Sequence, residues 1–169
     1  MNGLVFVDTN VLVYSRDASE LKKQPVAAEW IRTLWTEQRG RTSIQVLSEY
    51  YTTVTRKLKP GLDADDAWDD VTALLAWEPQ PIDRGVIARA REVERRYGLS
   101  WWDSMIVAAA QVQNCTALLS EDLHDGLVCG TVTVVSPFAL RIEDDHPSYM
   151  APAKPRSRHR GRGRPRRSA

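Results

Sequence analysis

Apolar positions along the chain follow two kinds of pattern: short continuous runs, and stripes in which every third or fourth residue is apolar. The short runs, rich in β-branched residues, predict strands over residues 4–7, 41–43, 117–120 and 131–135. The stripes predict helices over residues 25–39, 44–58, 64–75, 84–97 and from 101 onward. Two stretches fit neither pattern. Residues 8–24 are interpreted as a polar connection, and residues 79–82 as a brief extended segment between prolines.

The order of these elements predicts the fold class. Strands that alternate with helices form parallel sheets joined by right-handed crossovers. We therefore predict an α/β fold of three layers, in which a central, mostly parallel sheet of about five strands is flanked by helices. In the helix over residues 44–58, the apolar stripe that should face the core consists of Ile44, Leu47, Tyr51, Val54 and Leu58. Glu49 lies off that stripe.

The formal net charge of +1 conceals an uneven distribution. Of the 23 Lys and Arg residues, 8 lie in residues 151–169, which contain no acid. The preceding residues therefore carry 15 basic groups against 22 acidic ones. The periodic pattern also stops near residue 142, where Pro, Ser, Gly and Arg become dominant. We predict one folded domain over residues 1–142 and a disordered basic tail, rich in Pro and Arg, over residues 143–169.

The tail allows three interpretations. Its residues Arg162-Gly163-Arg164-Pro165 resemble the core of an AT-hook, which enters the minor groove of DNA. Its positive charges also suit nonspecific contact with the phosphates of a nucleic acid. The third interpretation is a loose extension that contributes nothing to binding.

Two further features narrow the class of protein. No apolar run approaches the roughly 18 residues of a membrane helix, and the N-terminus lacks the order of a signal peptide. We therefore expect a cytoplasmic protein with no membrane partner. Cys115 and Cys129 are the only cysteines, and we expect neither a bridge nor a metal role for them.

Four acidic residues occupy related places in the predicted topology. Asp8 follows the first strand, Glu49 lies in the first half of a helix, Asp103 opens another helix, and Asp122 follows a later strand. Ligand sites in α/β sheets lie just beyond the carboxyl ends of the strands. The topology therefore allows all four carboxylates to converge at one edge of the sheet.

Each acid also has a structural interpretation. Asp8 suits the cap of a helix or an Asx-turn, and Glu49 suits a solvated surface position. Asp103 forms a Ser-x-x-Asp pattern with Ser100, which is close to a capping box. Asp122, like Asp125 after it, can shape a loop.

Convergence would require a cation, because two carboxylates about 4 Å apart repel by roughly 4 kcal/mol at an effective dielectric near 20. The four acids offer only oxygen ligands, which select Mg²⁺ or Mn²⁺ over zinc. Such an ion lowers the pKa of bound water and neutralises charge on a phosphodiester. The chain shows no Ser, His or Cys nucleophile constellation and no Gly-rich phosphate loop. The favoured reaction is therefore hydrolysis of phosphodiester bonds.

Four motifs, in order, resemble those of PIN-domain ribonucleases, and most closely the VapC-type toxins of bacterial type II toxin–antitoxin systems. The resemblance covers residues 4 to about 140, and its motifs are Val-Asp-Thr-Asn-Val-Leu at 7–12, Ser-Glu-Tyr at 48–50, Trp-Trp-Asp-Ser-Met-Ile-Val-Ala-Ala-Ala at 101–110 and Leu-Leu-Ser-Glu-Asp-Leu at 118–123. The basic tail lies outside this pattern.

The resemblance implies a PIN-like domain that acts as a Mg²⁺-dependent endoribonuclease, with Mn²⁺ as a possible substitute. Its acidic constellation would be Asp8, Glu49, Asp103 and Asp122. Asp8 and Asp103 would be the principal metal ligands, Glu49 and Asp122 would complete the metal site or orient water, and Asn10 and Ser120 would support it. Asp125 is a weaker candidate. The implied partners are an RNA substrate, a small antitoxin protein and a second copy of the chain.

Two other functions remain as alternatives. Aspartyl-phosphate phosphatases also carry acids at strand ends, but they use Asp-x-Asp, and the third position here is Asn10. A non-catalytic protein that binds nucleic acid would use the basic tail and the arginines of the helix over residues 84–97.

Overall fold

A five-stranded sheet forms the centre of the structure, a computed structural model that describes residues 2–139. The strands lie in the order β2-β1-β3-β5-β4. β1, β2, β3 and β5 run parallel to their neighbours in this group, and only β4 pairs antiparallel, with β5. Their bounds are β1 (Leu4–Val7), β2 (Gly40–Arg41), β3 (Cys115–Leu119), β4 (Val128–Cys129) and β5 (Val132–Val135).

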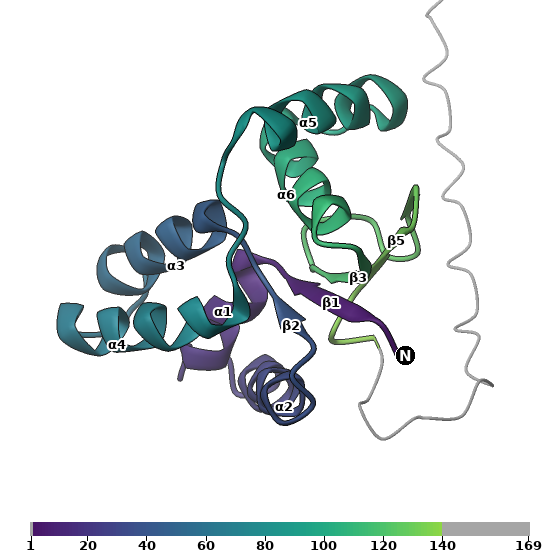
Figure 1. The fold of residues 1–169 in the computed structure, drawn as a ribbon. Helices are drawn as coiled ribbons and strands as arrows, with labels where there is room; N and C mark the ends of the chain where they lie inside the picture. Colours follow the sequence, from purple (N-terminus) through teal and green to yellow (C-terminus); the bar gives the residue numbers. More distant parts are fainter. Residues whose placement is uncertain (1, 140–169) are drawn as a thin grey trace, which may run out of the picture.

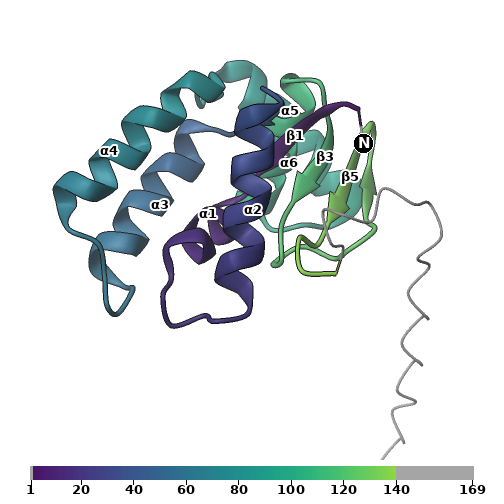
Figure 2. The same cartoon turned by 90° about the horizontal axis from the view of Figure 1, so that it is seen from below.

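Helices cover the sheet and extend beyond one of its edges (Figure 1). They are α1 (Thr9–Arg16), α2 (Lys23–Thr36), α3 (Ile44–Arg56), α4 (Ala64–Leu74), α5 (Arg84–Tyr97) and α6 (Trp101–Val112), with a 3-10 turn η1 (Leu75–Trp77) after α4. The α5–α6 pair packs through α6 on β3 and β5, whereas α1 packs against α2 and α3. Seen from below, α3 and α4 form the outer layer beside α1 and α2 (Figure 2). The predicted fold class, an α/β domain of three layers, is confirmed.

Burial explains why these segments form these elements. Val5, Phe6 and Val7 of β1 are completely buried, as expected for a strand covered on both faces. All seven residues from Ser104 to Ala110 of α6 are also buried, because this helix lies between the sheet and α5. Asp63 and Asp83 cap α4 and α5, where their side chains accept from the Asp65 and Val86 N–H groups.

The prediction of a polar connection over residues 8–24 is wrong in its first half. Residues Thr9–Arg16 form helix α1, whose Val11 and Leu12 are buried. The helix is only eight residues long, so its apolar stripe is too short to stand out from the surrounding polar residues. Asp8 caps this helix and accepts a hydrogen bond from the Thr9 N–H at 2.7 Å.

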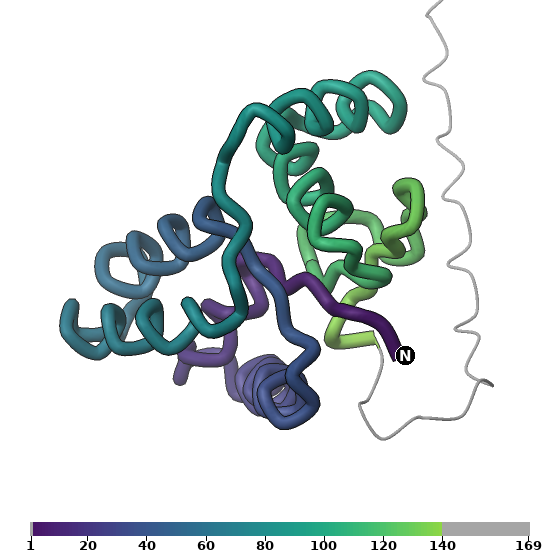
Figure 3. Tube along the Cα trace, in the orientation of Figure 1, coloured from purple at the N-terminus to yellow at the C-terminus, as the bar shows by residue number. Residues whose placement is uncertain are grey.

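The predicted total of about five strands holds, but one member differs. Residues 79–82 form no strand, and the only pairing there is an isolated bridge between Ser43 and Gln80. This segment carries the chain upward from α4 to α5 (Figure 3). The fifth strand is instead the two-residue β4, which lies between the predicted strands over residues 117–120 and 131–135.

The buried face of α3 also differs from the predicted stripe. Val46, Leu47, Tyr50 and Val54 are buried, whereas Ile44 is 40% exposed. Helical spacing alone places two neighbouring stripes on this segment, and packing against α1 and α4 selects between them.

Three further expectations concerned membrane helices, the two cysteines and the tail. Within residues 2–139, no helix is both long and apolar enough to cross a membrane. Cys115 and Cys129 are buried free thiols, and burial raises the pKa of Cys115 to about 12. The predicted tail over residues 143–169 lies outside the described residues.

Gly40 of β2 lies very close to the Trp77 ring of η1. A methyl group at Gly40 would meet atoms of the buried Trp77 ring at 2.4–2.7 Å. Gly40→Ala should therefore lower the free energy of unfolding by about 1–3 kcal/mol in urea titrations. The same substitution in a Trp77→Leu background should cost less, because the clashing ring is gone. Equal costs in the two backgrounds would contradict this explanation.

Candidate active site

Asp8 lies at the carboxyl end of β1, where the central strand passes directly into α1. The parallel register between β1 and β3 pairs Val7 with Leu119, so the residues that follow these two strands lie side by side. The Asp8 N–H donates to the Leu119 carbonyl at 3.0 Å, and its side chain is only 8% exposed. The sheet therefore holds this carboxylate at the edge where the sequence placed it.

Asn10 and Ser120 connect Asp8 with the segment after β3. The Ser120 hydroxyl, completely buried, donates to Asp8 Oδ2 at 2.8 Å. The Asn10 Nδ2 group lies 3.3 Å from Asp8 Oδ2, 3.3 Å from Ser120 Oγ and 3.1 Å from Asp122 Oδ2. The amide thus donates between two carboxylates, which offsets part of their repulsion.

Asp122 is exposed and follows β3 at a tight turn. Its N–H donates to Ser120 Oγ at 3.2 Å, and its carboxylate accepts from Asn10. The preceding Glu121 N–H donates to Asn10 Oδ1 at 3.2 Å. Asn10 therefore uses both ends of its amide to hold the segment that carries Asp122.

Glu49 reaches the same site from α3. Its Oε2 accepts from the Thr9 hydroxyl at 3.0 Å, and its Oε1 accepts from Gln45 Nε2 at 3.1 Å. Glu49 is exposed, as its surface interpretation requires, but its carboxylate is directed to the residue next to Asp8. The sequence analysis did not single out Thr9 or Gln45, although the i, i+4 spacing from Gln45 to Glu49 was a usable signal.

Asp103 stands apart from the other three acids. Ser100 caps α6 and donates its hydroxyl to Asp103 Oδ2 at 2.7 Å, while the Asp103 N–H donates back at 3.1 Å. The Ser-x-x-Asp pattern indicated a capping box, and half of it is formed: Ser100 caps the Asp103 N–H, whereas the Asp103 carboxylate accepts from the Ser100 hydroxyl instead of its backbone N–H. Within the described chain, no hydrogen bond joins Asp103 to Asp8, Glu49 or Asp122, so its role as a metal ligand stays a prediction.

Asp125 has a structural role. Its Oδ1 accepts from the Ser136 N–H at 2.8 Å, which ties the loop between β3 and β4 to the residue after β5. Within the described residues, no hydrogen bond joins Asp125 to Asp8, Glu49 or Asp122.

The electrostatics of Asp8 reflect its surroundings. Burial raises the pKa of Asp8 to about 6, because the charged form loses water. Hydrogen bonds from Ser120 and from the Thr9 N–H oppose this rise, and the neighbouring charges of Asp122 and Glu49 add to it. A pKa raised by burial and by nearby acids is typical of functional sites.

The donor set of this site suits a hard divalent cation. Asp8, Glu49 and Asp122 offer carboxylate oxygens, and no His or Cys contacts them among the described residues. Residues 2–139 nevertheless contain no group of three or more acids, histidines or cysteines close enough to hold a metal in this arrangement. The chemistry of the donors therefore fits such an ion, while the number of convergent ligands falls short.

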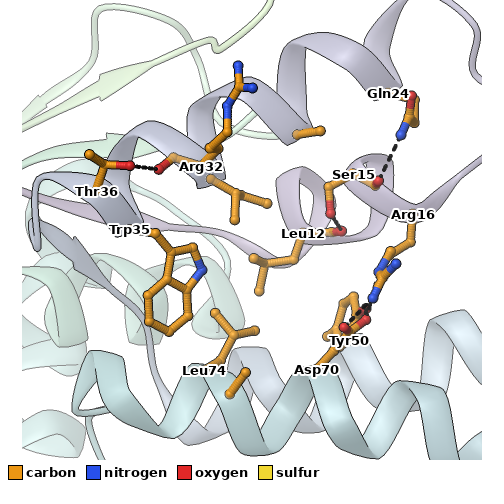
Figure 4. A pocket seen from close by; sticks show the side chains of 13 residues that line it. Leu12, Ser15, Arg16, Gln24, Arg32, Trp35, Thr36, Tyr50, Asp70 and Leu74 are labelled. Carbon is orange, nitrogen blue, oxygen red and sulfur yellow. Dashed lines mark hydrogen bonds and ion pairs between the residues drawn. The ribbon is translucent and has the colours of Figure 1, made fainter.

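A separate groove of about 560 Å³ lies between α1, α2, α3 and α4 (Figure 4). None of the four predicted acids lines it. Asp70, which the sequence analysis did not single out, accepts from the buried Tyr50 hydroxyl at 2.5 Å and from Arg16 Nε at 2.8 Å. Leu12, Trp35 and Leu74 add apolar surface. We call the sheet edge that carries Asp8, Glu49 and Asp122 the acidic edge. The acidic edge and the groove are therefore two distinct surfaces.

The fold and the acidic edge together define a class: an α/β domain with carboxylates gathered at the carboxyl ends of its central parallel strands. Comparison with protein families shows which family of this class the chain belongs to. A family model described as PIN domain matches residues 5–124, so the chain belongs to the PIN domain family. Comparison with curated proteins gives no match.

Two solved structures share the fold. A toxin–antitoxin complex from Klebsiella pneumoniae contains a chain with 18% identity and a TM-score of 0.56, and the match covers 79% of this chain and 97% of that one. VapC20 from Mycobacterium tuberculosis, described as a toxin that cleaves the sarcin–ricin loop, has 20% identity and a TM-score of 0.51, with coverages of 70% and 91%.

The raised pKa of Asp8 predicts a pH-dependent stability. Between its ordinary value of 3.8 and about 6, the folded state binds the proton more tightly than the unfolded state. Stability without metal should therefore fall as pH rises through this window. Asp8→Asn should remove the penalty and raise the free energy of unfolding at pH 8 by about 1–3 kcal/mol. Urea titrations in EDTA from pH 4 to 8 measure this effect.

The gain from Asp8→Asn should shrink as pH falls toward 4, because folded Asp8 is then protonated and a large fraction of unfolded Asp8 is protonated as well. Asp66→Asn, at an exposed position of α4, is the matched control for the change from carboxylate to amide. A gain that is independent of pH would contradict the assignment to Asp8 ionisation.

Proposed function

We propose that this protein is a metal-dependent endoribonuclease that hydrolyses RNA phosphodiester bonds and acts as the toxin of a toxin–antitoxin pair. One observation carries the proposal: Asp8, Glu49 and Asp122 are linked at one sheet edge by hydrogen bonds from Thr9, Asn10 and Ser120. Membership of the PIN domain family and the fold shared with a toxin–antitoxin complex and with VapC20 support it.

Mg²⁺, with Mn²⁺ as a substitute, is the proposed cofactor. Asp8 and Asp103 would be its principal ligands, and Glu49 and Asp122 would complete the site or orient water. The ion supplies a water of lowered pKa and neutralises charge on the scissile phosphate when bound. Of the residues themselves, Ser120 and Asn10 keep the Asp8 and Asp122 carboxylates oriented toward each other despite their repulsion.

The remaining proposals concern partners and location. A small antitoxin protein is the expected partner, and the groove of Figure 4 offers it apolar surface next to the fixed Arg16–Asp70 pair. We also propose a homodimer, a cytoplasmic location and nonspecific contact of residues 143–169 with RNA. The arginines of α5 give less support to a purely nucleic-acid-binding function, since Arg89 and Arg91 are paired with Glu92 and Glu94.

Cleavage of RNA tests the nuclease assignment. Purified protein incubated with a mixed RNA pool and Mg²⁺ should produce discrete fragments, and EDTA should abolish them. Asp8→Asn, Asp103→Asn and Asp122→Asn should each reduce the rate on the order of 100-fold or more, because each removes a metal ligand. Glu49→Gln should cost about 10–100-fold, as expected for a group that acts less directly.

Asp66→Asn should cleave at the wild-type rate, because Asp66 lies outside the site on α4. Cleavage that survives EDTA would refute metal dependence. RNA binding without cleavage in any buffer would instead support the non-catalytic alternative.

Growth of an expressing culture tests the toxin assignment. Expression of the wild-type chain should slow growth, since cleavage of cellular RNA limits translation, and expression of Asp8→Asn should not. Co-expression of the small protein encoded beside it should restore growth. Normal growth with soluble, active wild-type protein would indicate a nuclease that is not a toxin.

A further inference from the structure

Four elements meet in a charged and aromatic cluster beside the acidic edge. We define the Lys23 cluster as Tyr14 of α1, Lys23 of α2, Glu121 after β3 and Phe138 after β5. Lys23 Nζ donates to Glu121 Oε1 at 2.5 Å and to the Tyr14 hydroxyl at 3.2 Å. It also lies 4.6 Å from the centre of the Tyr14 ring and 5.4 Å from that of Phe138. One cation therefore ties together segments that are far apart in the sequence.

Glu121 links this cluster to the candidate active site. It stands between Ser120 and Asp122, and its N–H donates to Asn10 Oδ1 at 3.2 Å. The other end of the Asn10 amide donates to Asp8 and Asp122. The side chain of Glu121 is thus held by Lys23 while its backbone holds Asn10, which fixes the segment from both sides.

Further contacts hold the residues of the Lys23 cluster and their neighbours in place. Phe138 contacts Tyr14 edge to face, with ring centres 5.3 Å apart, and the buried Trp30 Nε1 donates to the Pro137 carbonyl at 3.1 Å. Gln24 Nε2, beside Lys23, donates to the Ser15 carbonyl at 3.1 Å and joins the start of α2 to the end of α1. Lys23 therefore has little freedom to leave Glu121.

The basic partner of this ion pair is better shielded than that of the surface pair on α5. The side chains of Lys23 and Glu121 are each 31% exposed, whereas Arg91 is 63% and Glu94 32% exposed. Although burial alone would raise the pKa of Glu121, hydrogen bonds from Lys23 and Tyr14 lower it. Shielding from solvent strengthens the Coulomb attraction, and the aromatic faces of Tyr14 and Phe138 add to it.

We propose that Lys23 and Glu121 are positioning residues of the candidate active site, which act by holding Asn10 and Asp122 in place relative to Asp8. This inference rests on the nuclease function proposed above. Neither residue is a catalytic residue, because their charged groups are paired with each other. Loss of the pair leaves the segment over residues 120–122 held only by the bonds of Ser120 and Asn10, so Asp122 should become less ordered.

The test compares Lys23→Met and Glu121→Gln with the wild-type protein. The rate at saturating RNA should fall by about 10–100-fold, as expected for groups that orient ligands. The RNA concentration for half-maximal cleavage should change by less than about threefold, because the pair contributes to the reacting geometry rather than to binding. Mn²⁺ affinity, measured by calorimetry without RNA, should fall by about tenfold.

Two variants separate positioning from general stability. Lys23→Arg should retain the rate within about threefold, since a guanidinium also pairs with a carboxylate and lies over aromatic rings. Arg91→Met removes the surface pair with Glu94, 2.6 Å apart, and should leave both rate and Mn²⁺ affinity unchanged. Thermal melting shows whether each variant is folded at the assay temperature.

The outcomes are distinct. A folded Lys23→Met or Glu121→Gln protein with wild-type rate and Mn²⁺ affinity would overturn the positioning role while leaving the nuclease proposal intact. Losses of rate that merely follow melting temperature, in Arg91→Met as well, would also overturn it. A wild-type protein that neither cleaves RNA nor binds Mn²⁺ would overturn the proposed function and this inference together.

Discussion

Repulsion between carboxylates gathered at one sheet edge is the constraint on which the rest of this structure depends. Asp8 is nearly buried, and the charges of Glu49 and Asp122 raise its pKa further. The donors that offset this cost come from Ser120 and from the two ends of the Asn10 amide. An arrangement that keeps acids together against their repulsion needs a rigid scaffold, and the proposed cation would relieve that repulsion.

The parallel pairing of β1 with β3 supplies that rigidity. Because residues of the two strands lie side by side up to Val7 and Leu119, the polar residues that follow them must meet. The strands are buried, with α6 packed on β3 and β5 and α2 packed on β2, so they cannot shift without opening the core. The Lys23 cluster ties this same edge to α2 and to the residues after β5.

Metal binding would change the balance of this site. Asn10 Nδ2 now donates between Asp8 and Asp122, and a cation between these carboxylates would take over part of that role. The Asp103 carboxylate accepts from the hydroxyl of Ser100, the N-cap residue of α6. Among the described residues the four predicted acids therefore form two groups: three share hydrogen-bonding partners, and Asp103 shares none with them.

The sequence by itself determined the class of fold and most of the acidic edge, because buried strands and polar residues at their carboxyl ends have local signatures. The placement of Asp8 and Asp122 follows from that logic, whereas Asn10 and Ser120 were implied by the resemblance to PIN-domain ribonucleases. Tertiary structure decided what local patterns leave ambiguous. Packing selected the buried face of α3, which directed Glu49 to Thr9, and it made a helix of the short segment after Asp8. Pairings such as Lys23 with Glu121 join residues 98 positions apart, and no periodicity within the chain encodes such a contact.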